Sequence, residues 1–186
     1  MRILRLIVLY TAIAAGANGA LAADMASVEA LREGSLKKLM FHDDPRAVPD
    51  IAVTARDGGE VRLSDYQGKW VVLNFWATWC APCRVEMPAL DRLQGEMGGP
   101  GFAVVTVATG RNSPRGIDKL FEETGVTRLP KLQDPSSALA RNMGVMGLPV
   151  TVILNPEGQE IARMTGDAEW DSDSAKAIVA ALMGGG

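Results

Sequence analysis

The stretch VVLNFWATWCAPCRVEMPAL spans residues 71–90 and contains both cysteines of the chain, Cys80 and Cys83. Its first six residues are almost all β-branched, aromatic or otherwise apolar, which is typical of a strand buried on both faces of a sheet. From residue 81 to residue 97 the apolar side chains recur at helical spacing, and two glycines follow. The cysteines therefore lie where the carboxyl end of a buried strand meets the start of a helix.

The segments around this unit alternate between predicted strands and helices. In chain order, we expect a hairpin at 51–63, a strand at 102–107, a helix at 117–124, a short strand at 132–134, a helix at 136–142, a hairpin at 149–165 and a helix at 172–183. This order predicts an α/β fold with a mixed central β-sheet flanked by helices and an N-terminal β-hairpin extension.

Length and composition favour one compact domain. The chain has 186 residues, of which 47% are hydrophobic, enough for a packed core. Its 19 Lys and Arg against 22 Asp and Glu give a net charge of −3 with no basic patch, so nucleic acid is not an expected partner. We divide the chain into an export segment at 1–23, a spacer and helical lead-in at 24–44, and a folded domain at 45–183.

Residues 1–23 have the features of an export segment. Arg2 and Arg5 precede an uncharged run of 18 residues, which is at the lower limit for crossing a bilayer, roughly 18 to 20 residues. Ala20-Leu21-Ala22 resembles a signal-peptidase site, so a cleavable signal peptide and a membrane anchor both remain open. Export would place the cysteines in an oxidising compartment, where a cysteine pair closes unless it is reduced.

The lead-in at 24–44 shows a polar helical pattern. Val28, Leu31, Leu36 and Leu39 form a loose apolar stripe, which predicts a docking helix. His42 follows in a polar stretch and is expected to be a solvated loop side chain.

Two cysteines separated by two residues can form a structural disulfide, part of a metal site, or a redox pair. A zinc or iron–sulfur site usually needs four protein ligands, and the chain offers two cysteines and one histidine. A disulfide that closes so short a loop constrains the unfolded chain little. The start of a helix, in contrast, favours a thiolate, which is the form that attacks a disulfide. The redox interpretation is therefore preferred, with no cofactor and no metal.

Position along the helix assigns the two sulfurs different roles. Cys80 precedes the helix and is expected to be exposed, whereas Cys83 lies one turn inside and is sheltered. We predict that Cys80 attacks and that Cys83 resolves the mixed disulfide. Pro82 between them restrains the loop and removes one backbone donor.

The segment 71–90 resembles the active-site segment of the thioredoxin superfamily, in its exported, often membrane-tethered TlpA/ResA/CcmG-like branch. GLPVTVILNPEGQEIARMTG, at 147–166, is similar to the proline loop and hairpin of that family, and GDAEW, at 166–170, is similar to TlpA. The resemblance covers residues 45–183. Within 109–140 it rests on the order of helices and strands more than on matching residues. It implies a thioredoxin-like fold and thiol:disulfide oxidoreductase activity in the periplasm, either soluble or tethered to the inner membrane.

The resemblance implies further site residues. Pro149 matches the family's cis-proline, which turns the backbone of Leu148 toward an incoming peptide. Trp79 would form part of a flat apolar surface around Cys80. Clients would bind at Trp79, Pro82, Leu148 and Pro149.

One position departs from thioredoxin. Asn74 stands where thioredoxin has a buried aspartate, and an amide cannot take up a proton. Glu86 lies three residues after Cys83 on the same helix face, where the exported branch has a glutamate. A buried carboxyl there would have a raised pKa and could exchange protons with Cys83. We therefore expect Cys80, Cys83 and Glu86 to be catalytic.

The function expected from the sequence is reduction of protein disulfides. The residue after Pro82 is not the histidine found in strong oxidants such as DsbA, which favours a reductant. The resemblance implies a monomer whose clients are a copper-delivery protein, a cytochrome oxidase subunit or apocytochrome c, and a membrane thiol donor of the DsbD/CcdA type. Two alternatives are a Cu(I)-binding metallochaperone, with a thioether from Met143 or Met146, and a thiol peroxidase.

Overall fold

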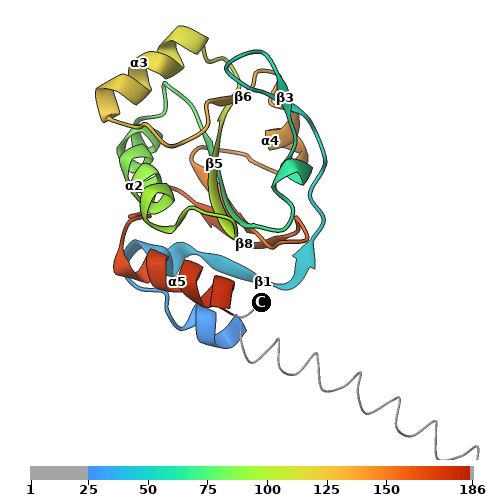
Figure 1. The fold of residues 1–186 in the computed structure, drawn as a ribbon, viewed down its shortest axis with the longest axis vertical. Helices are drawn as coiled ribbons and strands as arrows, with labels where there is room; N and C mark the ends of the chain where they lie inside the picture. Colours follow the sequence, from blue (N-terminus) through green and yellow to red (C-terminus); the bar gives the residue numbers. More distant parts are fainter. Residues whose placement is uncertain (1–24, 185–186) are drawn as a thin grey trace, which may run out of the picture.

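The computed structural model describes residues 25–184, so the predicted export segment lies outside the described residues. Within that range eight strands form one mixed sheet in the order β1-β8-β7-β4-β5-β6-β2-β3 (Figure 1). The strands are β1 (Met40–Arg46), β2 (Val53–Thr54), β3 (Glu60–Val61), β4 (Trp70–Trp76), β5 (Phe102–Thr109), β6 (Leu132–Asp134), β7 (Val150–Leu154) and β8 (Glu160–Thr165). The helices are α2 (Ala81–Met97), α3 (Pro114–Thr124), α4 (Ala138–Asn142) and α5 (Asp173–Gly184), with 3-10 helices η1 (Gly34–Lys38) and η2 (Leu63–Tyr66).

The centre of the sheet confirms the predicted mixed α/β fold. β4 runs parallel to β5 and antiparallel to β7, and every residue of β4 after Trp70 is buried. β5 is in turn parallel to β6. The carboxyl ends of β4, β5 and β6 therefore meet at one edge, and α2 starts at that edge with the cysteines.

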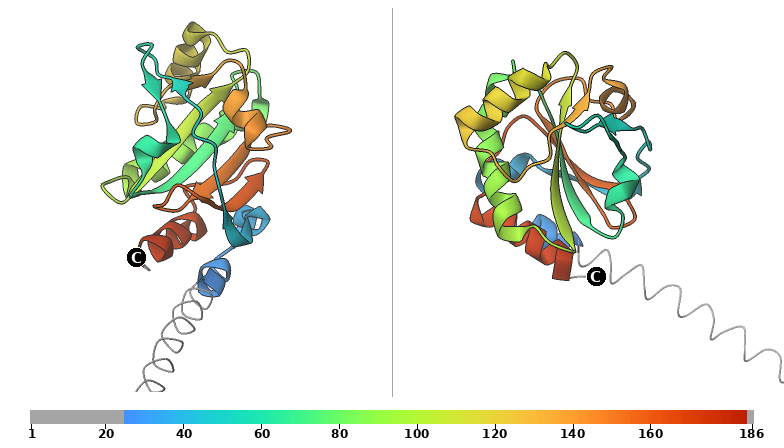
Figure 2. Two further views of the ribbon diagram at one scale, coloured as in Figure 1. Left: turned by 90° about the vertical axis from the view of Figure 1, so that its right-hand side faces the viewer. Right: turned by 45° about the horizontal axis from the view of Figure 1, so that its top comes forward.

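Two apolar layers cover the two faces of the sheet. One layer joins α2, α3 and α5 to inward-facing residues such as Val72 and Val104. The other joins α4 and η2 to the opposite face, through residues such as Leu73 and Val105. The right-hand view of Figure 2 shows α2 and α3 on one side of the sheet and α4 on the other. Alternating side chains of one strand thus serve two cores.

The N-terminal hairpin is present where it was predicted. β2 and β3 pair antiparallel, and Gly58 takes φ +89° in the turn between them. A residue with a Cβ would be strained at this φ, so the glycine permits the tight reversal. The hairpin extends the sheet beyond β6.

The expectation of a helical lead-in at 24–44 was wrong for its second half. Residues 25–29 are helical and η1 follows, but Met40–Arg46 form β1, which pairs with β8 at the edge of the sheet. Its sequence, MFHDDPR, does not alternate between apolar and polar residues, and none of them is fully buried. Main-chain pairing with β8 stabilises the strand, and the side-chain pattern does not reveal such pairing.

His42 is not the solvated loop residue that we expected. It lies in β1, and its Nε2 is 2.8 Å from Oε1 of Glu160 on β8. Arg163 donates two further hydrogen bonds to the same carboxylate, at 2.7 and 2.6 Å. Burial raises the pKa of Glu160, but hydrogen bonds from Arg163 and His42 outweigh it and the pKa is lowered overall. The cluster ties β1 to β8.

Among residues 25–184, no helix is both long and apolar enough to cross a bilayer.

Candidate functional site

The two cysteines are joined in a disulfide at the start of α2. Cys80 is the N-cap residue of the helix, and its Sγ accepts a hydrogen bond from the backbone N–H of Cys83 at 3.3 Å. Pro82 occupies the first turn, where its missing N–H leaves no broken helical bond. Cys83 is fully buried and Cys80 is 6% exposed, so Cys80 is more covered than we expected but is still the more accessible sulfur.

The loop before Cys80 presents an aromatic ring to solvent. Trp79 is 67% exposed, whereas Trp76 at the end of β4 is buried. Asn112 fixes this loop, because its Oδ1 accepts hydrogen bonds from the backbone N–H of Thr78 at 2.8 Å and from the Thr78 hydroxyl at 2.9 Å. Asn112 was missed from the sequence. The available signal was an asparagine three residues after a parallel strand, at the edge where the cysteines were expected.

The peptide bond between Leu148 and Pro149 is cis, as the resemblance implied. Pro149 directly precedes β7, whose first residue, Val150, pairs with Phe75 near the end of β4. Leu148 packs against the apolar cluster that includes both cysteines. The structure thus brings the proline loop to the cysteine edge of the sheet.

Glu86 is buried one helical turn from Cys83, with 2% of its surface exposed. The Asn74 amide donates to Oε1 at 2.8 Å, while the backbone N–H of Ala168 and the indole N–H of Trp170 donate to Oε2, each at 3.3 Å. Asn74 also donates to the hydroxyl of Thr151 at 2.9 Å. Asn74, which stands where thioredoxin has an aspartate, therefore holds Glu86, the residue predicted to exchange protons in place of that aspartate.

Burial decides the proton affinity of this carboxyl group. Desolvation raises the pKa of Glu86 to about 7, although hydrogen bonds from Asn74, Ala168 and Trp170 oppose the shift. The negative charge of Asp167 adds a smaller upward contribution. At neutral pH the group can therefore either accept or release a proton, which suits acid–base work beside a thiol.

A cleft of about 610 Å³ reaches Glu86 from the surface. It lies between the middle of α2, η1 and the loop before α5. Its lining residues are Ser35, Lys38, Val85, Glu86, Ala89, Arg92, Asp167, Ala168, Glu169 and Asp171. The cleft gives the buried acid a polar border on the side of α2 that faces α5.

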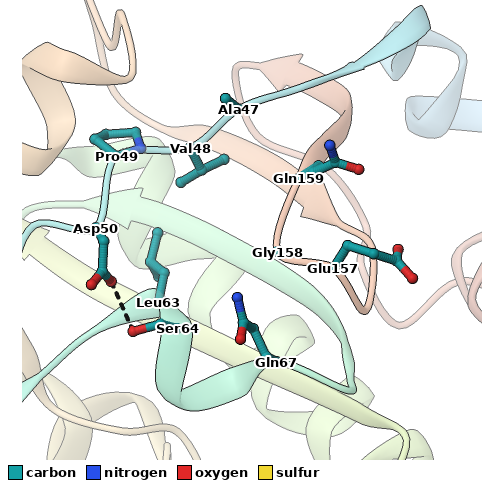
Figure 3. A pocket seen from close by; sticks show the side chains of 10 residues that line it. All are labelled: Ala47, Val48, Pro49, Asp50, Leu63, Ser64, Gln67, Glu157, Gly158 and Gln159. Atoms are coloured by element: carbon teal, nitrogen blue, oxygen red, sulfur yellow. Dashed lines mark hydrogen bonds between the residues drawn. The ribbon is translucent and has the colours of Figure 1, made fainter.

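A second pocket, of about 210 Å³, lies between η2 and the turn that joins β7 to β8 (Figure 3). Asp50 in this pocket accepts a hydrogen bond from the Ser64 hydroxyl at 2.8 Å. The β7–β8 turn lies beside the start of β4, since Val71 pairs with Leu154. The pocket is therefore at the opposite end of the sheet from the cysteines.

The family model for AhpC/TSA matches residues 45–162, which include the cysteines, Glu86 and Pro149. The chain belongs to the AhpC/TSA family. Its fold is thioredoxin-like, in agreement with the expectation from residues 71–90.

Relatives of this AhpC/TSA-family protein are named for thiol–disulfide exchange or as thioredoxin-like. The thiol-disulfide oxidoreductase ResA of Geobacillus thermodenitrificans (strain NG80-2) is 35% identical over 119 residues, covering 63% of this chain and 67% of the relative. The thioredoxin-like protein YneN of Bacillus subtilis (strain 168) is 35% identical over 122 residues, covering 66% and 71%. The crystal structure of a putative thiol:disulfide interchange protein DsbE from Chlorobium tepidum matches 75% of this chain and 98% of its own, with 30% identity and a TM-score of 0.66.

The two methionines considered as Cu(I) ligands differ in their exposure to solvent. Met143 is buried at the C-terminal end of α4, whereas Met146 is 96% exposed, so the two thioethers occupy different environments. Within residues 25–184 no group of three or more His, Cys, Asp or Glu side chains is placed to hold a metal ion.

Proposed function

We propose that this chain reduces disulfide bonds of client proteins in the periplasm. The chain is a thiol:disulfide oxidoreductase: it shares the thioredoxin-like fold with relatives named for that activity, and it carries the Cys80–Cys83 disulfide at the start of α2. The observation that carries the proposal is the buried Glu86 one turn from Cys83, at the edge of the sheet where Pro149 also lies.

The geometry supports a two-step exchange. In the reduced protein, the Cys80 thiolate attacks a client disulfide, forms a mixed disulfide and displaces one client thiolate. Cys83 then gives its proton to the Glu86 carboxylate, attacks the Cys80 sulfur and releases the second client thiolate. Two electrons pass from the enzyme dithiol to the client, and the enzyme disulfide is formed. A membrane thiol donor of the DsbD/CcdA type would return the two electrons.

The arrangement favours this order of attack. Cys80 is the more accessible sulfur and lies at the N-terminus of α2, where free N–H groups stabilise a thiolate. Cys83 has no exposed surface, so it can react only with a sulfur already bound to Cys80. We propose as clients the cysteine pairs of a copper-delivery protein, a cytochrome oxidase subunit or apocytochrome c.

Trapping tests the roles of the sulfurs. Reduced Cys83→Ser protein, mixed with a peptide that contains an internal Cys-x-x-Cys disulfide, should accumulate a mixed disulfide through Cys80, detectable by mass spectrometry. Cys80→Ser is the matched control and should form no adduct. Adducts with Cys80→Ser alone would reverse the assigned roles, and adducts with neither variant would contradict reductase function.

The same reduced protein separates the alternatives. Rapid consumption of hydrogen peroxide without a client would support a thiol peroxidase. Stoichiometric Cu(I) binding that survives competition with a chelator would support a metallochaperone.

For localisation, cell fractionation should recover the protein in the periplasm or on the inner membrane, and recovery from the cytoplasm would contradict export.

A further inference from the structure

The edge of the sheet that holds the cysteines has an uneven charge. The segments 77–84, 110–116 and 135–149 follow the carboxyl ends of β4, β5 and β6. Together they contain no Asp or Glu and the arginines Arg84, Arg111, Arg115 and Arg141. The chain as a whole carries a net charge of −3, so this concentration of arginine is a local feature.

Contacts bring the second segment directly beside the cysteine loop. Asn112 accepts both hydrogen bonds from Thr78, two residues before Cys80. A Cβ at Gly116 would lie 3.8 Å from the methyl carbon of Thr78. Arg111 and Arg115 are the sequence neighbours of these two contact residues, so both belong to the backbone segment that touches the Cys80 loop. Figure 1 shows α3, which begins within the second segment, and α4, which lies within the third, on either side of β6.

Two of the four arginines already have partners. Arg84 forms an ion pair with Glu123 at 3.2 Å, and Arg141 donates to the carbonyl of Ser136. Arg111 and Arg115 are exposed and form no ion pair with any residue in 25–184. Their charges are therefore available to a docked partner, in the segment that touches the loop carrying the exposed Trp79.

The flank beyond Pro149 carries charges of both signs. The backbone N–H of Gly166 donates to the Pro149 carbonyl at 2.9 Å, and the loop that follows contains Asp167, Glu169 and Asp171. Arg92 pairs with Asp171 at 2.7 Å, which leaves Asp167 and Glu169 without an ion pair among the described residues. Lys38 donates to the Asp167 carbonyl on the same flank, so acidic and basic groups are mixed there, whereas the segment 110–116 carries arginine alone.

We propose that the client segment entering over Cys80 is acidic on the side that faces Arg111 and Arg115. This inference rests on the proposed function and adds a selection rule to it. Arg111 and Arg115 would steer an acidic peptide toward the disulfide and orient it, because complementary charges raise association rates and disfavour partners of like charge. The effect should weaken with salt, since exposed charges are screened over about 10 Å at 0.1 M ionic strength.

Three peptides test the inference. Each contains the same internal Cys-x-x-Cys disulfide, flanked by Asp, by Asn or by Lys, and the reduced protein is mixed with each in stopped flow at low and high salt. The wild-type protein should reduce the Asp peptide about tenfold faster than the Lys peptide at low salt, the lower end of electrostatic steering. The ratio should approach one at high salt.

Charge variants locate the effect. Arg111→Gln/Arg115→Gln should lose most of the preference, whereas the matched control Lys37→Gln/Arg46→Gln, which removes two exposed cations away from the cysteine edge, should keep it. Equal rates for all three peptides, or a preference unchanged in the arginine variant, would overturn the inference while reduction itself stands. Absence of reduction of every peptide would overturn the proposed function as well.

Discussion

A carboxyl group that is buried beside a thiol and titrates near neutrality is suited to moving protons during exchange. Glu86→Gln removes the titration while keeping the size of the side chain. We expect reduction of a model disulfide to slow by roughly 10²-fold, the lower end of the range for positioned acid–base groups. The pH dependence near pH 7 should disappear, since the pKa of Glu86 is about 7. Stopped-flow rates across neutral pH measure both, and a pH profile like that of the wild type would mean that Glu86 does not exchange protons with Cys83.

The raised pKa also affects stability. Glu86 binds its proton more tightly in the folded state, with a pKa of about 7 against an ordinary value of 4.5, so its stabilisation is full below pH 4.5 and is lost as pH rises through 7. The free energy of unfolding of the wild type, relative to Glu86→Gln, should therefore fall by on the order of 3 kcal/mol across that window. Urea unfolding of both oxidised proteins at several pH values measures this difference. A difference in unfolding free energy that does not change with pH would mean that folding does not shift the pKa of Glu86.

Asn74 offers a test of the partner of Glu86. Asn74→Asp places a second carboxyl group where the amide now donates to Glu86 at 2.8 Å. Two carboxyl groups so close cannot both ionise readily, so one pKa of the pair should rise further and the pH profile of Cys80 alkylation should move to higher pH. Thr151→Val removes the other partner of Asn74 without adding a charge and serves as control. An unchanged pH profile of Cys80 alkylation in Asn74→Asp would show that the titration of the two carboxyl groups is not coupled.

At the scale of elements, α2 connects the redox chemistry at its start to a structural anchor at its middle. The buried Asp91 accepts from the backbone N–H groups of Thr127 and Arg128, at 3.0 and 2.6 Å, and from the Arg128 side chain at 2.7 Å. These bonds hold α2 to the turn after α3.

Asp91→Ala should therefore reduce the free energy of unfolding by about 1.5 to 3 kcal/mol, because it removes the hydrogen bonds that three donors make to a buried, charged acceptor. The redox potential of the cysteines, measured against glutathione, should stay unchanged. Arg128→Ala is the matched control and should cost less, since Arg128 is largely exposed and both backbone bonds remain. A shifted potential in Asp91→Ala would mean that the anchor also positions the cysteines.

At the scale of the whole molecule, β1 covers an edge of the sheet. β8 is mostly buried and pairs with β1 on its outer side, so removing residues up to Arg46 would expose unpaired backbone groups beside Ile161, Ala162 and Met164. We expect the shortened protein to associate with itself, as uncovered edge strands do. Light scattering should detect species larger than the full chain, and a monomeric shortened protein would show that β1 is dispensable.

The parts of the fold that depend on local sequence were predictable. The bounds of α2 and the position of the cysteines matched because a buried strand followed by an amphipathic helix is visible within residues 71–97. Helical spacing also placed Glu86 on the face of Cys83. The groups that complete its environment could not be predicted from spacing, since Trp170 and Ala168 are more than 80 residues away in the chain. β1 and its His42–Glu160 contact were missed for the same reason.

The cleft beside Glu86 has one more consequence. None of the residues that line it belongs to the three arginine-bearing segments, so a client confined to those segments would leave it open. Electrons would pass between sulfurs at the surface around Cys80, while the protons that Glu86 takes up would exchange with bulk water through the cleft. Turnover would then need no solvent between enzyme and client, and the covered sulfurs would be protected from small oxidants for the lifetime of the complex.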